Sequence, residues 1–191
     1  MKPYFFVSAL ALLAFAATSA CAQQKLIPAQ SEIAFTSKQM GVPVDGKFKK
    51  FDAQVAFDPK KPEAAKIAFS IELGSAALGS AESEAELVKP EWFNTKLFPL
   101  ATFQSGTVKA TGPGKFEVAG KLTIKGASQD VLVPVALAQT GGPSGMTTAS
   151  GSFAIKRLDF KIGDGDWKDT SMVANDVQIK FKLTLSGVGA M

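Results

Sequence analysis

The sequence predicts an all-β fold, an antiparallel barrel of about eight strands with one short helix. Apolar and polar residues alternate with a period of two along most of the chain, stretches rich in Gly, Pro and Asp separate the alternating runs, and a single segment is rich in helix formers. Strict alternation places one row of side chains inward and one outward on a half-buried strand. Closing such strands into a barrel leaves no exposed sheet edge.

The alternating runs follow one another along the chain, and each predicts one strand. Turn-forming stretches such as Gly41-Val42-Pro43, Thr111-Gly112-Pro113-Gly114 and Gly141-Gly142-Pro143-Ser144-Gly145 lie between them. The apolar rows are Ile33 and Phe35; Phe51, Val55 and Phe57; Ile67, Phe69, Ile71 and Leu73; Phe116, Val118, Leu122 and Ile124; Val131, Val133, Val135 and Leu137; Phe153 and Ile155; and Val177, Ile179, Phe181, Leu183 and Leu185.

Two irregularities interrupt the alternation. Phe48 and Phe51 are three positions apart, so an extra residue near Lys49-Lys50 is needed to restore the phase, and we expect a β-bulge there. Pro134 falls within an apolar strand, where its missing N–H is tolerated mainly at an edge or a bulge.

The one segment with helical character is Ser80 to Lys89. Ser80 suits the N-cap, and glutamates in the early turns are favoured by the helix dipole. Pro90 follows at once and ends the pattern. The sequence therefore predicts a short helix that connects two strands.

The N-terminus has the pattern of a signal peptide over residues 1–22. Lys2 precedes an almost wholly apolar run from Phe5 to Ala17, and Ala20-Cys21-Ala22 forms a small-residue cleavage site. We therefore expect export to the periplasm, with residues 23–191 forming the barrel domain. The alternative, a lipoprotein acylated at Cys21, lacks the Leu-like residue usually found where this chain has Thr18.

Composition excludes several function classes. The chain has no His and a single Cys, so it has no Ser-His-Asp triad, no His- or Cys-based metal site and no internal disulfide. Asp164, Asp166 and Asp169 lack the glycine and the final glutamate of a calcium loop. A net charge of +4 is too small to indicate nucleic-acid binding. We expect no enzyme activity, no metal and no cofactor.

Several segments resemble YceI-like, lipocalin-like proteins, in order over residues 25 to 186. They are Ser31-Glu32-Ile33-Ala34-Phe35, Gly46-Lys47-Phe48 with Val55-Ala56-Phe57-Asp58, Leu87 to Asn94 followed by Phe98 to Phe103, Gly120 to Gly126, Ile155 to Phe160, and Asn175-Asp176-Val177. The resemblance implies an extended antiparallel eight-stranded barrel in the periplasm that binds a polyisoprenoid chain, as a polyprenyl phosphate or a quinone tail. Where the family's helix often has Arg-Asp and then His, this chain has Ser83, Glu84 and Glu86.

An apolar pore could hold such a chain without any catalytic group, because each buried methylene contributes roughly 0.8 kcal/mol. Ordinary core packing is the alternative role for each lining residue. We select Trp92, Phe93 and Trp167 as an aromatic mouth or as loop anchors. The residues selected as pore lining are Ile33, Phe35, Phe57, Phe69, Ile71, Phe103, Leu122, Ile124, Val133, Phe153, Ile155 and Phe181.

Other functions and partners stay open at this level. A β-sandwich interaction module with a solid core would show similar alternation, and so would an outer-membrane barrel, although the aromatic girdles of the latter are missing. Five lysines, Lys47, Lys49, Lys50, Lys60 and Lys61, form either a solvated face or a patch that meets phosphate or an anionic membrane surface. Transient contact with a membrane surface or a membrane redox protein, and homodimerisation, are further open interpretations.

Overall fold

A computed structural model describes residues 24–140 and 145–190, and the predicted signal peptide and Cys21 lie outside these ranges. One antiparallel sheet dominates the fold, in the order β4-β5-β7-β8-β9-β10-β11-β2-β3-β6, with β1 paired to β11. The strands are β1 (Lys25–Leu26), β2 (Glu32–Gln39), β3 (Val42–Phe48), β4 (Phe51–Ala56), β5 (Lys66–Glu72), β6 (Ala76–Ala77), β7 (Leu100–Gly112), β8 (Lys115–Ile124), β9 (Ala127–Thr140), β10 (Met146–Lys156) and β11 (Asp176–Ser186).

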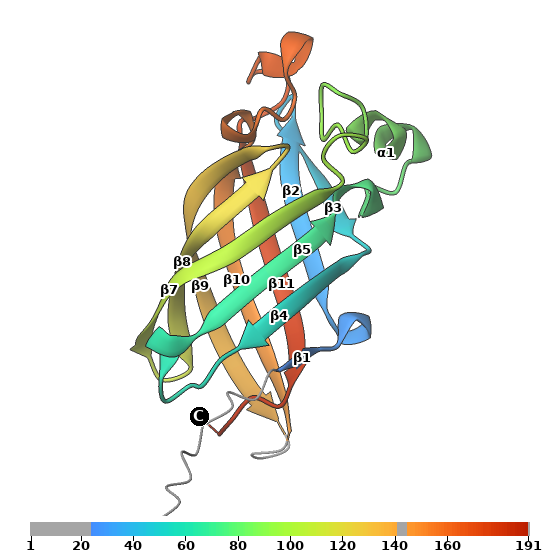
Figure 1. Cartoon of the computed structure of the whole chain (residues 1–191). Helices are drawn as coiled ribbons and strands as arrows, with labels where there is room; N and C mark the ends of the chain where they lie inside the picture. Colours follow the sequence, from blue (N-terminus) through green and yellow to red (C-terminus); the bar gives the residue numbers. More distant parts are fainter. Residues whose placement is uncertain (1–23, 141–144, 191) are drawn as a thin grey trace, which may run out of the picture.

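The sheet curls strongly, so that β4, β5 and β7 lie in front of β10, β11 and β2 in Figure 1. Two halves of the same sheet therefore enclose the interior with one shared inner face. This arrangement confirms the predicted all-β, lipocalin-like barrel, although the ends of the sheet, β4 and β6, are not paired with each other and the barrel is a half-barrel. It differs from a β-sandwich, in which two separate sheets pack face to face.

The strand count exceeds the predicted eight because one predicted strand is two. Nine strands of the described chain have six or more residues. The predicted bulge at Lys49-Lys50 is wrong: β3 ends at Phe48 and pairs with β2, whereas β4 begins at Phe51 and pairs with β5. The two residues between them carry the chain from one end of the sheet order to the other, which explains the break in phase.

The prediction for Pro134 is confirmed. Pro134 pairs with Glu117 of β8, but the ladder between β9 and β10 reaches only from Met146/Thr140 to Ser150/Ala136. On the β10 side, Pro134 therefore lies at an unpaired edge, where no ladder hydrogen bond is lost.

The single α-helix, α1 (Ala81–Leu87), is also confirmed, with Ser80 at its N-cap. The Ser80 hydroxyl accepts a hydrogen bond from the Ser83 N–H at 3.4 Å. Figure 1 shows α1 at the same end of the barrel as the loops between β10 and β11. Five 3-10 helices also occur in the described chain: η1 (Pro28–Gln30), η2 (Pro62–Ala64), η3 (Leu73–Ser75), η5 (Arg157–Phe160) and η6 (Gly165–Lys168). Within the described ranges, no helix has the length and apolar character needed to cross a bilayer.

Two hydrophobic clusters fill the interior along the barrel axis. The first, here called the tube cluster, is centred on residues such as Val55, Val118 and Leu183. The second, the cap cluster, lies under the loops at the α1 end and includes Leu73, Phe160 and Val173. Phe103, Ile71 and Phe153 contact both clusters, so the apolar interior is continuous.

Candidate functional site

An apolar cavity of about 150 Å³ lies within the tube cluster. Strict alternation produces it, because successive inward residues of β4, β5 and β7 to β11 face one another across the curled sheet. Cavities of roughly this size with an apolar lining stay dry and bind small hydrocarbons. The twenty lining residues are all apolar: Ile33, Val55, Phe57, Ile67, Phe69, Ile71, Phe103, Val108, Phe116, Val118, Leu122, Val133, Val135, Leu137, Ala149, Phe153, Ile179, Phe181, Leu183 and Leu185.

The structure divides the fifteen residues selected from the sequence into two groups. Those in the first group line the cavity: Ile33, Phe57, Phe69, Ile71, Phe103, Leu122, Val133, Phe153 and Phe181. Those in the second group do not line it and belong to the cap cluster instead: Phe35, Trp92, Phe93, Ile124, Ile155 and Trp167. Ile124 and Ile155 share a face with Leu122 and Phe153 but lie one inward position further toward the loops, beyond the cavity.

The remaining lining residues mostly continue rows that the alternation had already identified, as Val135 and Leu137 continue the row of Val133. Val108 is the exception, because Phe103 and Val108 both point inward although they are five positions apart. A register shift between Ser105 and Thr107, at Gly106, reverses the phase of β7 between them. Alternation alone does not predict such a bulge, so Val108 was missed.

The predicted aromatic group does form at the loop end. The ring centroids of Trp92 and Trp167 are 5.5 Å apart, and those of Phe48 and Phe93 are 6.2 Å apart. Trp92 and Phe93 are each only 8% exposed, so they are packed in the cap cluster rather than displayed at an opening. Their geometry therefore matches loop anchoring more closely than a mouth.

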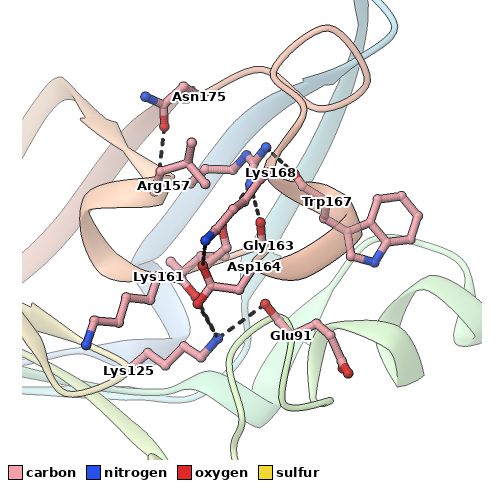
Figure 2. Close-up of polar contacts among 11 residues, drawn as sticks. Glu91, Lys125, Arg157, Lys161, Gly163, Asp164, Trp167, Lys168 and Asn175 are labelled. Carbon is pink, nitrogen blue, oxygen red and sulfur yellow. Dashed lines mark hydrogen bonds and ion pairs between the residues drawn. The ribbon is translucent and has the colours of Figure 1, made fainter.

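Arg157 holds the loops over this end of the barrel, a role that the sequence did not reveal. Its side chain is buried, with 2% of the residue exposed, and its guanidinium donates only to backbone carbonyl groups. Nε donates to Ala174 at 3.1 Å, Nη1 to Ile162 and Gly163 at 2.8 and 2.9 Å, and Nη2 to Trp167 and Val173 at 2.6 and 2.8 Å. Figure 2 shows the guanidinium surrounded by the loop that it fixes.

Lys125 is the second buried cation and lies beside this loop (Figure 2). Its ammonium donates to the carbonyl oxygens of Lys161 at 2.6 Å and Glu91 at 3.2 Å, and lies 3.9 Å from the Asp164 carboxylate. Desolvation lowers the pKa of Lys125 below its ordinary value, an effect that Asp164 and Glu91 partly offset. Lys125 therefore joins the β8–β9 turn to the two loops that cover the barrel.

Three acidic side chains at the loop end, Glu84, Asp164 and Asp169, contact neighbouring groups of the fold. Glu84 of α1 accepts hydrogen bonds from the backbone N–H groups of Leu78 and Gly79. Asp164 faces Lys125 and Lys168, and Asp169 accepts from Ser171. Among the described residues, no three His, Cys, Asp or Glu side chains converge as a metal site.

Three of the five lysines considered as a basic patch, Lys47, Lys49 and Lys50, lie among carboxylates. Lys50 forms an exposed ion pair with Glu72 at 3.2 Å. Lys47 and Lys49 border a shallow surface depression together with Glu32, Asp45 and Glu84. This mixture of charges favours a solvated face over a phosphate site.

Comparison with known proteins finds one family. The sequence model of the YceI-like domain matches residues 25–185. Protein YceI of Salmonella arizonae is 32% identical over 169 residues, which cover 85% of this chain and 88% of that protein. A UPF0312 protein of Photorhabdus laumondii is 32% identical over 172 residues, covering 86% and 89%. The matches to UPF0312 proteins of Ectopseudomonas mendocina and Azotobacter vinelandii span only 63% and 62% of those proteins.

Solved structures show the same fold. The crystal structure of Burkholderia cenocepacia BcnA is similar, with a TM-score of 0.80 and 44% identity, over 84% of this chain and 99% of that one. A polyisoprenoid binding domain from Saccharophagus degradans superposes with a TM-score of 0.70 over 86% of this chain and 98% of its own. Its identity is 13%, so this second likeness concerns the fold.

Proposed function

The chain belongs to the YceI-like domain family, and we propose that it is a non-enzymatic protein that binds an isoprenoid lipid in its apolar cavity. The observation that carries the proposal is the lining: all twenty side chains around the cavity are apolar. Such a site offers a hydrocarbon chain burial from water but offers no nucleophile, acid or base for chemistry.

Two further observations support the choice of ligand. The cavity lining extends along β8 from Phe116 to Leu122 and along β11 from Ile179 to Leu185, so the cavity follows the strands, which suits an elongated chain better than a compact ligand. A structural relative with the same fold is a polyisoprenoid binding domain. Export to the periplasm through the signal-peptide pattern of residues 1–22 forms part of the proposal and gives the protein access to membrane lipids.

Ligand analysis of the purified protein tests the proposal. We expect native mass spectrometry and solvent extraction to find a co-purified isoprenoid, or the emptied protein to take up added polyprenols or ubiquinone. Protein that is repeatedly empty and takes up neither lipid class would overturn the proposed function.

A cavity-filling variant makes the test specific to the site. Ala149 lines the cavity, so Ala149→Leu adds three carbon atoms to the space that the ligand needs. Ala138 is exposed on β9, and Ala138→Leu is the matched control. We expect at least about tenfold weaker uptake for the first variant and unchanged uptake for the second, because only the first competes with the ligand for buried volume. Equal uptake by both variants would place the ligand elsewhere.

A further inference from the structure

One buried polar group at the end of the tube opposite the loops has no partner. Thr147, the second residue of β10, is completely buried. Its hydroxyl and the indole N–H of Trp92 are the two buried side-chain polar groups of the described residues that make no hydrogen bond. A buried hydroxyl left without a partner is costly, and native proteins satisfy nearly all such groups.

Strand register places Thr147 beside the cavity. Thr147 pairs directly with Leu185 of β11, and directly paired residues of antiparallel strands project from the same face of the sheet. Ala149 lies two positions further along β10 and therefore also shares this face. Leu185 and Ala149 both line the cavity. Thr147 is therefore the next inward-facing residue of β10 after Ala149, just beyond the end of the cavity lining.

The surroundings of Thr147 do not supply its missing partner. Gln139 lies opposite on β9, but its amide group donates to the carbonyl oxygens of Val188 and Gly189. Val188 and Leu26 belong to the tube cluster and cover this end of the interior with apolar side chains. The amide groups of Gln139 and Gln24 at this end are hydrogen-bonded to backbone groups. The hydroxyl is thus an unpaired polar group just past the end of an apolar cavity.

Charge restricts what could meet this hydroxyl. The two buried charged side chains of the described chain, Lys125 and Arg157, lie with the loops at the opposite end, and Arg157 follows the last residue of β10. Arg157 is ten positions from Thr147 along β10, or roughly 33 Å for an extended strand. A phosphate beside Thr147 would be a buried anion without a cation, which is strongly disfavoured.

We propose that Thr147 is a specificity-determining residue that hydrogen-bonds the polar end of the bound isoprenoid, and that this end is neutral, an alcohol or a ketone such as a quinone carbonyl, rather than a phosphate. The inference rests on the proposed function and adds the orientation of the lipid and the class of its headgroup. Thr147 can donate to a ketone and can donate to or accept from an alcohol.

Trp92 is the competing position for the polar end. Its N–H also lacks a partner, and like Thr147 it is not a lining residue, but Trp92 belongs to the cap cluster beyond the cavity. Thr147, in contrast, is directly paired to a lining residue. The two positions lie at opposite ends of the interior, so variants at each distinguish the two orientations of the ligand.

The experiment compares three probes of one carbon skeleton: geranylgeraniol, the corresponding C20 hydrocarbon without the hydroxyl, and geranylgeranyl phosphate. Their dissociation constants are measured by competition in native mass spectrometry, with the full chain and with Thr147→Val, Thr147→Ser and Trp92→Phe. Val has nearly the shape of Thr but lacks the hydroxyl, and Ser retains it. Thermal unfolding of each variant verifies that it folds.

We expect the unaltered protein to bind the alcohol roughly five- to tenfold more tightly than the hydrocarbon, which is the effect of one hydrogen bond, and more tightly than the phosphate. Thr147→Val should bind alcohol and hydrocarbon equally, whereas Thr147→Ser and Trp92→Phe should keep the preference. A preference that survives in Thr147→Val, is lost in Trp92→Phe, or favours the phosphate would overturn the inference. Failure of every protein to bind any probe would instead contradict the proposed function.

Discussion

The ring of Phe181 lies over Gly151, its direct partner across β10 and β11. A Cβ atom at position 151 would come within 2.5 Å of Cζ of this ring and within 2.2 Å of the Pro134 carbonyl oxygen. Phe35 likewise lies over its direct partner Gly46, and Phe103 lies over Gly120 diagonally across β7 and β8. A Cβ atom at position 46 or 120 would come within 2.3 or 2.5 Å of the ring. Phe181 and Phe103 line the cavity, so these glycines let large rings lie close to the wall instead of across the interior.

Gly151→Ala should therefore destabilise the protein. The new methyl group meets both a backbone oxygen and the Phe181 ring, and the backbone cannot move away as a flexible side chain could. We expect a loss of about 2 kcal/mol or more in the free energy of unfolding, by analogy with overpacked cores, measured by chemical denaturation.

Gly106→Ala is the matched control for this change. The nearest atom to a Cβ at position 106 is the Ala119 carbonyl oxygen, at 3.6 Å, which is ordinary contact. Its free energy of unfolding should stay within about 0.5 kcal/mol of the unaltered protein. If Gly151→Ala were as stable as Gly106→Ala, the close packing of Phe181 on β10 would be wrong.

Arg157→Lys should loosen the loops that cover the barrel. The guanidinium reaches five carbonyl oxygens of residues 162–174, and an ammonium has three donors on one atom and cannot span them. Carbonyl groups left unpaired in a buried site cost about 1–3 kcal/mol each. We expect a loss of about 3 kcal/mol in stability and faster proteolysis within residues 158–175.

Tryptophan fluorescence localises this effect. Trp167 contributes a carbonyl to Arg157, and its ring contacts Trp92, so release of the loop should shift the emission to longer wavelength before global unfolding. The surface change Lys156→Arg, at an exposed neighbouring position, should leave emission and proteolysis unaltered. Unaltered emission and proteolysis in Arg157→Lys would show that the five carbonyl contacts do not fix the loop.

Local patterns predicted most of the strands and the helix because alternation and capping are properties of neighbouring residues. Alternation identifies the inward rows, and Ser80 is identified as the N-cap because capping acts within one turn of helix. Pro134 is identified as an unpaired position because a residue without an N–H restricts which strand can pair with it. The predicted bulge between β3 and β4 is wrong because β3 and β4 pair with different strands, β2 and β5, and distant segments decide which strands pair. The same limit explains Val108, whose inward position depends on a register shift against β8.

Part of the cavity lining is predictable from the sequence for the same reason. Inward parity identified cavity residues such as Phe69 and Val133 but could not say where along the axis the cavity ends, so Ile124 and Ile155 were included although they lie in the cap cluster. Arg157 is identified by the hydrogen bonds that its guanidinium donates to distant backbone carbonyl groups. Thr147 is identified by the hydrogen bond that its buried hydroxyl lacks. Residue type alone gives no sign of either.

Lys125 should make stability depend on alkaline pH. Burial lowers its pKa in the folded protein below the ordinary 10.5, so between the folded and unfolded pKa values the unfolded chain binds more protons. Stability contributed by this group therefore rises with pH through that window and is lowest below it, where the buried ammonium must stay charged. Lys125→Met removes the titration while keeping a long side chain at the same left-handed position, where φ is 48°.

The measurement is the difference between the unfolding free energies of the unaltered protein and Lys125→Met from pH 7 to 10.5. Taking the difference cancels the other lysines, among them Lys89, whose pKa is raised by Glu86 and whose contribution has the opposite sign. We expect the difference to move in favour of the unaltered protein as pH rises. If the difference does not change with pH, the pKa of Lys125 in the folded protein is ordinary. If the difference moves in favour of Lys125→Met as pH rises, the ion pair with Asp164 outweighs desolvation of the ammonium.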